Sequence, residues 1–200
     1  MALAAAVGLA IVALGEDLSR AALLPTPFLI WAGVALIIGP ITYRVTDPRA
    51  GTAERLALVA VAGVAFFLVK VVRSPFTFTV VDELFHLTNL NNILATHHLY
   101  SPNPGLSVSA DYPGLEGTAS AIAMLAGISP FAAGTILVGI IRVTALCAQF
   151  ALFSAVSRSS AVGALGAVFS LANPNTLFFE GAFAYESLAL PLFLVLLAAL

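Results

Sequence analysis

The chain has few charged residues: of its 200 residues, 8 are Lys or Arg and 10 are Asp or Glu, which is 9% in all. Soluble domains usually carry about 25% charged side chains, so this sequence has too few polar groups to cover a surface that faces water. The Lys and Arg residues are scattered and the net charge is −2. This composition argues against nucleic acid as a partner, because nucleic-acid surfaces cluster basic residues.

The sequence also lacks a pair of cysteines, the basic region of a signal peptide and a phosphate-binding loop. Cys147 is the only cysteine, so the chain forms no intrachain disulfide. The N-terminus has no basic region ahead of its apolar run, unlike a signal peptide, and residues 2–15 are therefore interpreted as a membrane span. The sequence also has no Gly-rich phosphate-binding loop of the P-loop type.

Long apolar runs dominate what is present, and 60% of the residues are apolar. A helix crosses a bilayer with about 20 mostly apolar residues, and the backbone of a spanning segment needs internal hydrogen bonds because lipid offers none. The sequence therefore predicts an all-α protein with one transmembrane domain of about six spans over residues 1–200. The expected spans are 2–15 (extending towards Leu24), 27–43, 54–72, 131–157, 159–172 and 184–200.

Positive charges orient these spans, because cytoplasmic loops carry an excess of Lys and Arg. Arg44, Arg49 and Arg55 lie in the loop between the second and third spans. The loop at 73–118 has four acidic residues and, beyond its first residue, no Lys or Arg. Arg158 then falls on the cytoplasmic side. We expect a multi-pass plasma-membrane protein with a cytoplasmic N-terminus and an external loop at 73–118.

The external loop is expected to carry two interfacial helices. Residues 117–128 are apolar but only about 18 Å long as a helix, so we expect them to lie at the outer interface. Residues 82–99 form an amphipathic pattern, in which Asp82, His86 and Asn89 share one face and Glu83 lies beside it. We expect this polar face to point towards an aqueous cavity at the membrane surface. The apolar stripe consists of Leu84, Leu87, Leu90 and Leu94.

Asp82, Glu83 and His86 are the first candidates for chemistry. A partly buried carboxylate beside such a cavity suits a general base. Two simpler interpretations remain open: acidic residues stabilise a helix N-terminus, and His86 is then an ordinary solvated side chain. Asp and His four residues apart also suit a metal, although two ligands are a weak signal.

Further candidates follow in the same loop. His97 and His98 either contact a phosphate or diphosphate group or are solvated loop residues. Tyr112 precedes Pro113 just before an apolar helix, so it is either an aromatic anchor with proline in the first helical turn or part of a binding site.

Arg142 is a charge inside an apolar run. A buried arginine in a membrane costs at least about 2.5–3.5 kcal/mol, so it either snorkels to the surface, forms a structural ion pair, or binds a carboxylate or a donor phosphate. Glu180 and Glu186 lie near the outer ends of the last two spans. Lys70 and Arg73 end the third span and are interpreted as interface anchors.

The order of these features resembles the C-type glycosyltransferase (GT-C) fold, and in particular the protein O-mannosyltransferases and aminoarabinose transferases. The resemblance covers residues 54–200, which would be about the first third of such an enzyme, with 1–53 as two additional spans. The chain ends inside an apolar run, and we expect more sequence to follow it. The residues that carry the resemblance are Asp82-Glu83, Tyr112-Pro113, Arg142, Arg158 and Tyr185-Glu186.

The resemblance implies an inverting transfer of a sugar from a polyprenyl-phosphate carrier to an acceptor hydroxyl on a glycan, lipid or protein. It implies Asp82 as the base and Glu83 as its support, with His86, His97, His98, Tyr112, Arg142 and Glu186 as substrate-binding residues. Some relatives bind a divalent cation such as Mg²⁺ or Mn²⁺, and only Glu180 or Glu186 would hold it here. The chain departs from the family in having Tyr-Pro-Gly rather than Tyr-Pro-Pro and Glu rather than Asp at 186.

Two other functions fit the residues. Pro and Gly interruptions together with Arg142 are also found in transporters and lipid flippases, whose broken helices form sites at the bilayer midplane. A non-catalytic membrane subunit is the third hypothesis, and it would tolerate substitution of Asp82 and Glu83.

Overall fold

A computed structural model of the chain describes residues 1–21, 26–173 and 181–199. Its regular structure is helical, and no strand occurs in these residues. This result confirms the predicted all-α fold class. The helices are α1 (Ala2–Arg20), α2 (Pro27–Thr46), α3 (Thr52–Arg73), α4 (Val81–Thr96), the 3₁₀-helix η1 (Ser107–Asp111), α5 (Gly114–Ala126), α6 (Pro130–Ser157), α7 (Ser160–Ser170) and α9 (Tyr185–Ala199).

Four of the described helices, α1, α2, α3 and α6, are long and apolar enough to cross a membrane. The two other expected spans correspond to α7 and α9, which are apolar but shorter. Helix α1 runs past residue 15 towards Leu24, as expected, and Glu16 and Arg20 in its last turns bind the end of α3. Arg20 donates to the carbonyl oxygen of Val72 at 2.8 Å, and Arg73 lies 3.1 Å from Glu16.

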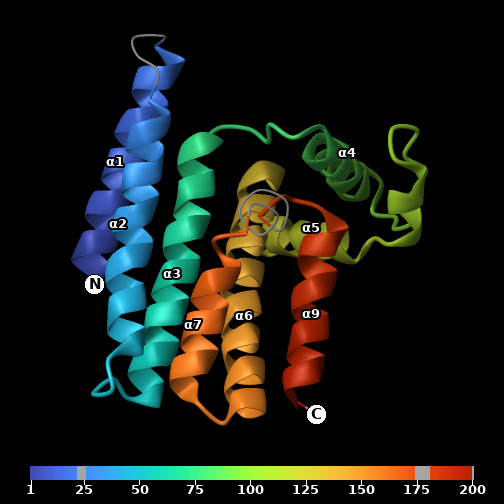
Figure 1. Ribbon diagram of the computed structural model, residues 1–200. Coiled ribbons are helices and arrows are strands. Elements are labelled where there is room, and N and C mark those ends of the chain that lie inside the picture. Colours follow the sequence, from blue (N-terminus) through green and yellow to red (C-terminus); the bar gives the residue numbers. More distant parts are fainter. Residues whose placement is uncertain (22–25, 174–180, 200) are drawn as a thin grey trace.

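The long helices lie roughly side by side and alternate in direction, and α3 lies between the α1–α2 pair and helices α6 and α7 (Figure 1). Helices α1 and α2 meet at two glycines: a Cβ atom on Gly8 would lie 2.6 Å from the carbonyl oxygen of Gly33. Ile37, Phe66 and Leu146 belong to the apolar core that joins α2, α3 and α6.

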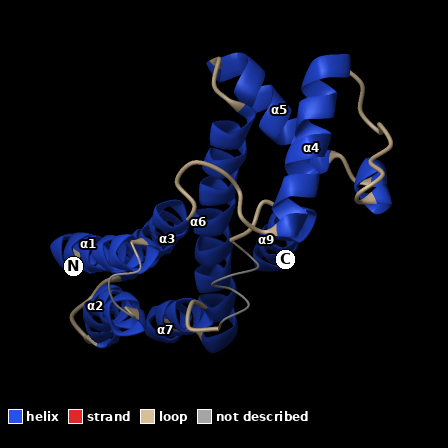
Figure 2. Ribbon diagram, turned by 90° about the horizontal axis from the view of Figure 1, so that it is seen from above, coloured by secondary structure: helices blue, strands red, loops and turns tan. Residues whose placement is uncertain are grey.

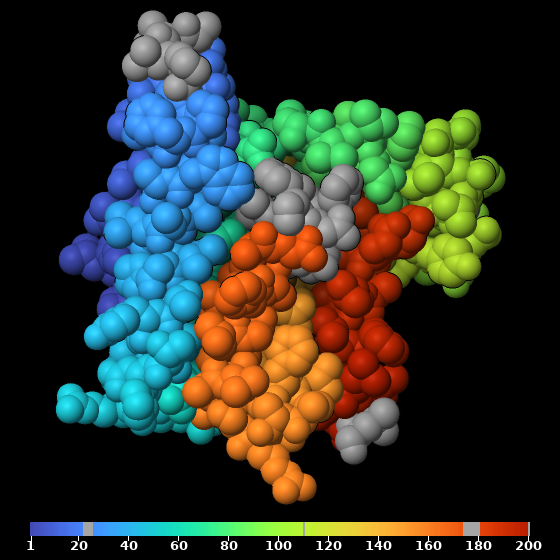
Figure 3. All heavy atoms as spheres, viewed as in Figure 1, coloured from blue at the N-terminus to red at the C-terminus, as the bar shows by residue number. Residues whose placement is uncertain are grey.

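Helices α4 and α5 lie across one end of this bundle rather than along it (Figures 1 and 2). We call residues 81–126 the cap. Figure 3 shows the cap on the α9 side of that end, projecting beyond α9, while the α1–α2 pair on the other side is not covered by it. A second apolar core, which includes Leu90, Leu115, Val138 and Phe183, holds the cap on α6 and the start of α9. The two short helices predicted in the external loop are thus present, with boundaries shifted by up to three residues.

Candidate functional site

The polar face of α4 points into the protein, which corrects our prediction that it faces an aqueous cavity. His86 is 0% exposed and Asn89 is 2% exposed, whereas Leu84, from the predicted apolar stripe, is 41% exposed. The physical reason is a polar partner on α5: Glu116 is also 0% exposed and accepts hydrogen bonds from this face. The burial also excludes the interpretation of His86 as a solvated residue.

His86, Asn89 and Glu116 form a buried polar cluster between α4 and α5. Nδ1 of His86 lies 2.7 Å from Oε1 of Glu116, and Nδ2 of Asn89 donates to the same oxygen at 3.3 Å. Glu116 lies in the first turn of α5, where the positive end of the helix dipole stabilises a carboxylate. Both neighbouring side chains therefore meet at one oxygen of Glu116, at the N-terminal end of α5.

Each residue of this cluster keeps one polar atom without a hydrogen-bond partner in the described part of the chain: Nε2 of His86, Oδ1 of Asn89 and Oε2 of Glu116. Buried polar atoms without partners are uncommon in folded proteins, and each costs stability. Other buried atoms of this kind lie apart from one another on Thr135 and Ser154, whereas three meet in this cluster, which makes it a candidate site.

Asp82 lies on the accessible side of His86. About 45% of its side chain is exposed, and its Oδ2 is 4.0 Å from Nε2 of His86. This separation is slightly too long for a hydrogen bond, but the side chain is free enough to close it. Asp82, His86 and Glu116 therefore form a row that leads from the surface into the interior.

Two tyrosines lie next to this row. The ring of Tyr185, at the start of α9, is 5.4 Å from the imidazole of His86. The ring of Tyr112 is 6.3 Å from that of Tyr185 and is 61% exposed. The ring of Tyr185 thus has contacts with both His86 and Tyr112. Glu186, the next residue of α9, is exposed.

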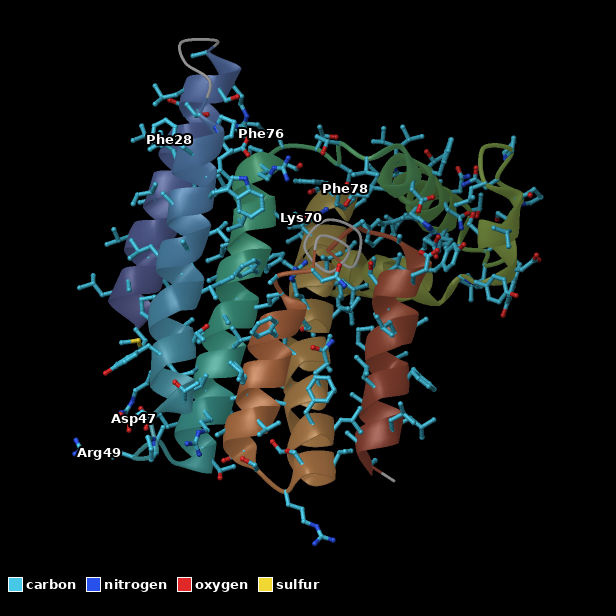
Figure 4. The ribbon with its side chains drawn as sticks, viewed as in Figure 1. Phe28, Asp47, Arg49, Lys70, Phe76 and Phe78 are labelled. Atoms are coloured by element: carbon cyan, nitrogen blue, oxygen red, sulfur yellow. The ribbon has the colours of Figure 1, made fainter. Side chains whose placement is uncertain are left out.

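Glu83 occupies a different position from Asp82. It is 0% exposed and accepts hydrogen bonds from Nζ of Lys70 and from the backbone N–H of Phe183, the latter at 2.9 Å. It also accepts from the N–H of Val80, at the start of its own helix, at 3.3 Å. Glu83 therefore joins α3, α4 and the segment before α9. Lys70 pairs with this carboxylate and does not act as the expected interface anchor; Figure 4 shows it beside Phe78.

The remaining predicted site residues lie apart from Asp82. His97 and His98 are exposed at the far end of α4, and a helix of 16 residues is about 22 Å long. Arg142 is 4% exposed, so it does not snorkel. It lines a small pocket inside the bundle together with Gln149 and Ser187. Glu180 lies outside the described residues.

A groove of about 410 Å³ lies near the same end of the bundle, between the α1–α2 pair, α3 and the segment that leads to the cap. Ile30, Trp31 and Phe66 contribute its apolar lining, and Lys70 and Arg73 lie at its edge. Both cations have carboxylate partners, since Lys70 pairs with Glu83 and Arg73 with Glu16. The groove therefore carries little unbalanced charge.

Glu116 is the site residue that the sequence analysis missed. We used it only as one of the acidic residues that orient the external loop. Its signal is a carboxylate in the first turn of a helix that is otherwise small and apolar. Such a carboxylate stabilises the helix N-terminus, but it also predicts a polar partner wherever that helix is buried.

Among the residues that the structure describes, no group of three His, Cys, Asp or Glu side chains is arranged to hold a metal ion. No protein family, curated protein or solved structure matches the chain.

Proposed function

We propose that this protein is a membrane glycosyltransferase that transfers a sugar from a polyprenyl-phosphate carrier to an acceptor hydroxyl. The observation that carries the proposal is the row formed by Asp82, His86 and Glu116 at one end of a bundle of apolar helices. Asp82 is an accessible carboxylate at that end, and a positioned carboxylate can serve as the general base that takes a proton from a hydroxyl nucleophile.

The reaction is an inverting displacement. Asp82 takes the proton of the acceptor hydroxyl while the acceptor oxygen forms a bond to the anomeric carbon of the sugar. The bond from this carbon to the carrier phosphate breaks on the opposite side, and its electron pair stays on the phosphate oxygen. A positioned base contributes about 10²–10⁴-fold to the rate of such a step.

The position of Asp82 suits both substrates. A lipid-linked donor diffuses in the bilayer and presents its phosphate at the membrane surface, and the acceptor arrives from water. The cap lies where the apolar helices end (Figure 1), so a base on α4 meets both. Tyr112 and Tyr185 add aromatic faces and hydroxyl groups that suit a sugar ring. We place this end on the external side of the plasma membrane, in keeping with the loop charges.

A transporter of lipids or solutes is the second candidate, and the observation that favours it is Arg142. This arginine is 4% exposed in the middle of α6 and lines a pocket inside the bundle. Intramembrane charges often mark a transport pathway. A transporter would lose activity when Arg142 is replaced by Met, would tolerate Asp82→Asn, and would release no carrier phosphate.

The test measures turnover by the protein purified in detergent, with radiolabelled polyprenyl-phosphate sugars as donors and a panel of acceptor hydroxyl compounds. We expect Asp82→Asn to lower kcat by about 10²–10⁴-fold. The matched control is Asp111→Asn, the same chemical change at an exposed acidic residue of the cap, which should keep wild-type activity. An active Asp82→Asn protein would remove Asp82 as the base, and a lack of turnover with every donor would contradict the proposed function.

A further inference from the structure

The buried pair His86–Glu116 has no role in the reaction as described so far. Both side chains are 0% exposed, so neither touches a substrate in this structure. The pair also lies next to atoms without partners, which makes it a costly element of the fold. Its position directly behind Asp82 suggests what it does.

We propose that His86 receives the proton which Asp82 takes from the acceptor, and that Glu116 is a positioning residue that orients His86 for this transfer. This inference rests on the proposed function and extends it to two residues that do not contact the substrate. The 2.7 Å contact between Nδ1 of His86 and Oε1 of Glu116 is the starting point.

Glu116 fixes the hydrogen-bonding state of His86. An ionised carboxylate only accepts hydrogen bonds, so Nδ1 of the imidazole carries a hydrogen and donates it to Glu116. In the neutral imidazole the other nitrogen, Nε2, is then an acceptor. This nitrogen has no hydrogen-bond partner among the described residues and lies 4.0 Å from Oδ2 of Asp82.

The proton transfer has a clear direction in this geometry. Asp82 becomes a carboxylic acid when it takes the acceptor proton, and its O–H then donates to Nε2 of His86. If the proton moves on, Asp82 returns to a carboxylate and His86 becomes an imidazolium between two carboxylates, which stabilise its charge. The proton leaves from His86 through Asp82 to water once the product has departed, so no atom or charge remains unbalanced.

The other charged groups around His86 do not replace Glu116 in this role. Its own helix contributes Asp82 and Glu83, and Glu83 is already paired with Lys70 of α3. Helix α9 contributes Tyr185, in ring contact with the imidazole, and the exposed Glu186. The short helix η1 contributes Asp111 at its exposed end. Helix α6 has one charged residue, Arg142, which lines the separate pocket near Ser187.

The experiment compares His86→Asn and Glu116→Gln with the wild-type protein. Asn places an amide near the position of Nδ1, so it keeps a donor for Glu116 and removes the nitrogen that faces Asp82. Gln keeps the shape of Glu116 and removes its charge. We expect each variant to lower kcat by about 10–100-fold, as for other groups that orient a reactive residue, with KM changed less than about 3-fold because no substrate contact is lost.

The pH dependence of kcat separates this role from a merely structural one. We expect the pH profile of kcat to differ in shape between each variant and the wild type, because the proposed proton acceptor is removed in one variant and loses its charged partner in the other. A structural role would instead lower the melting temperature and the active fraction and leave the shape of the profile unchanged. This inference would be overturned if both variants kept the wild-type kcat and pH profile while Asp82→Asn was inactive. That result would leave the proposed function intact. An active Asp82→Asn protein would remove Asp82 as the base, and this inference with it.

Discussion

Both ends of the helix bundle bury charged side chains, but the two ends differ in whether the buried polar atoms have hydrogen-bond partners. At the end where α2 turns into α3, Arg55 is 9% exposed and donates to the carbonyl oxygens of Val45 and Asp47, each at 2.9 Å. It also donates to Oγ of Ser160 at the start of α7, again at 2.9 Å. At the cap end, His86, Asn89 and Glu116 each keep an unpartnered atom within the described part of the chain.

This difference in hydrogen bonding suggests that the network around Arg55 stabilises the fold, whereas the cluster in the cap serves the proposed reaction. The Arg55 network closes the turn between α2 and α3 and ties it to α7, and Arg44 adds contacts to Asp47 and Glu54 on the surface of the same turn. Every contact there holds two elements together. The cluster behind Asp82 leaves hydrogen-bonding capacity unused in a buried position, which natural proteins tolerate mainly where a site needs it.

The largest loss of stability is expected from Glu83→Ala, because Glu83 is the one buried carboxylate of the cap that is fully engaged in holding helices together. The change leaves Lys70, whose side chain is 17% exposed, without its partner, and also removes the acceptor for the N–H of Phe183. Breaking such a pair costs about 3–5 kcal/mol. Unfolding in detergent, followed by denaturant or temperature, measures this cost.

The control for Glu83→Ala is the double variant Lys70→Met, Glu83→Met. It removes both charges, so the unpaired cation disappears and part of the lost stability should return. If the double variant is no more stable than Glu83→Ala, the ion pair is not the source of the effect.

A smaller loss is expected at the other end from Arg55→Met. The two carbonyl oxygens that Arg55 binds would remain partly buried without a donor, and an unsatisfied buried group costs about 1–3 kcal/mol. Arg49→Met is the matched control, because its side chain projects away from the same end (Figure 4). We expect this control to leave the melting temperature unchanged, and equal losses in the two variants would mean that the buried network adds no stability.

Much of the fold could be predicted from the sequence, because local patterns determine most of these helices. The apolar runs gave the positions of α2, α3 and α6 to within about three residues at each end, and Pro130 at the first position of α6 follows the usual preference for proline there. The sequence allowed α1 to run on from residue 15 towards Leu24, but its end at Arg20 involves contacts with α3, 52 residues further along the chain.

The orientation of α4 is the prediction that was wrong, and it is the one on which the site depends. Amphipathic analysis assumes that the apolar face is buried. Here Glu116, 30 residues from His86, accepts hydrogen bonds that make it possible to bury His86 and Asn89 as well as Leu90 of the apolar stripe. Asp82 is accessible and does not depend on a buried partner from another helix, so the sequence alone could indicate it as a candidate base.

The smallest change in stability is expected when the whole cluster is made apolar. The triple variant His86→Leu, Asn89→Ala, Glu116→Met removes the three unpartnered atoms together with the hydrogen bonds between their side chains. Replacing a buried polar network with packed apolar groups is often neutral or stabilising, and swaps of similar volume usually cost less than about 1.5 kcal/mol. We therefore expect a melting temperature at or above that of the wild type, with kcat reduced at least as much as in His86→Asn. A triple variant as unstable as Glu83→Ala would show instead that the cluster holds α4 on α5, and the contrast between the two ends of the bundle would disappear.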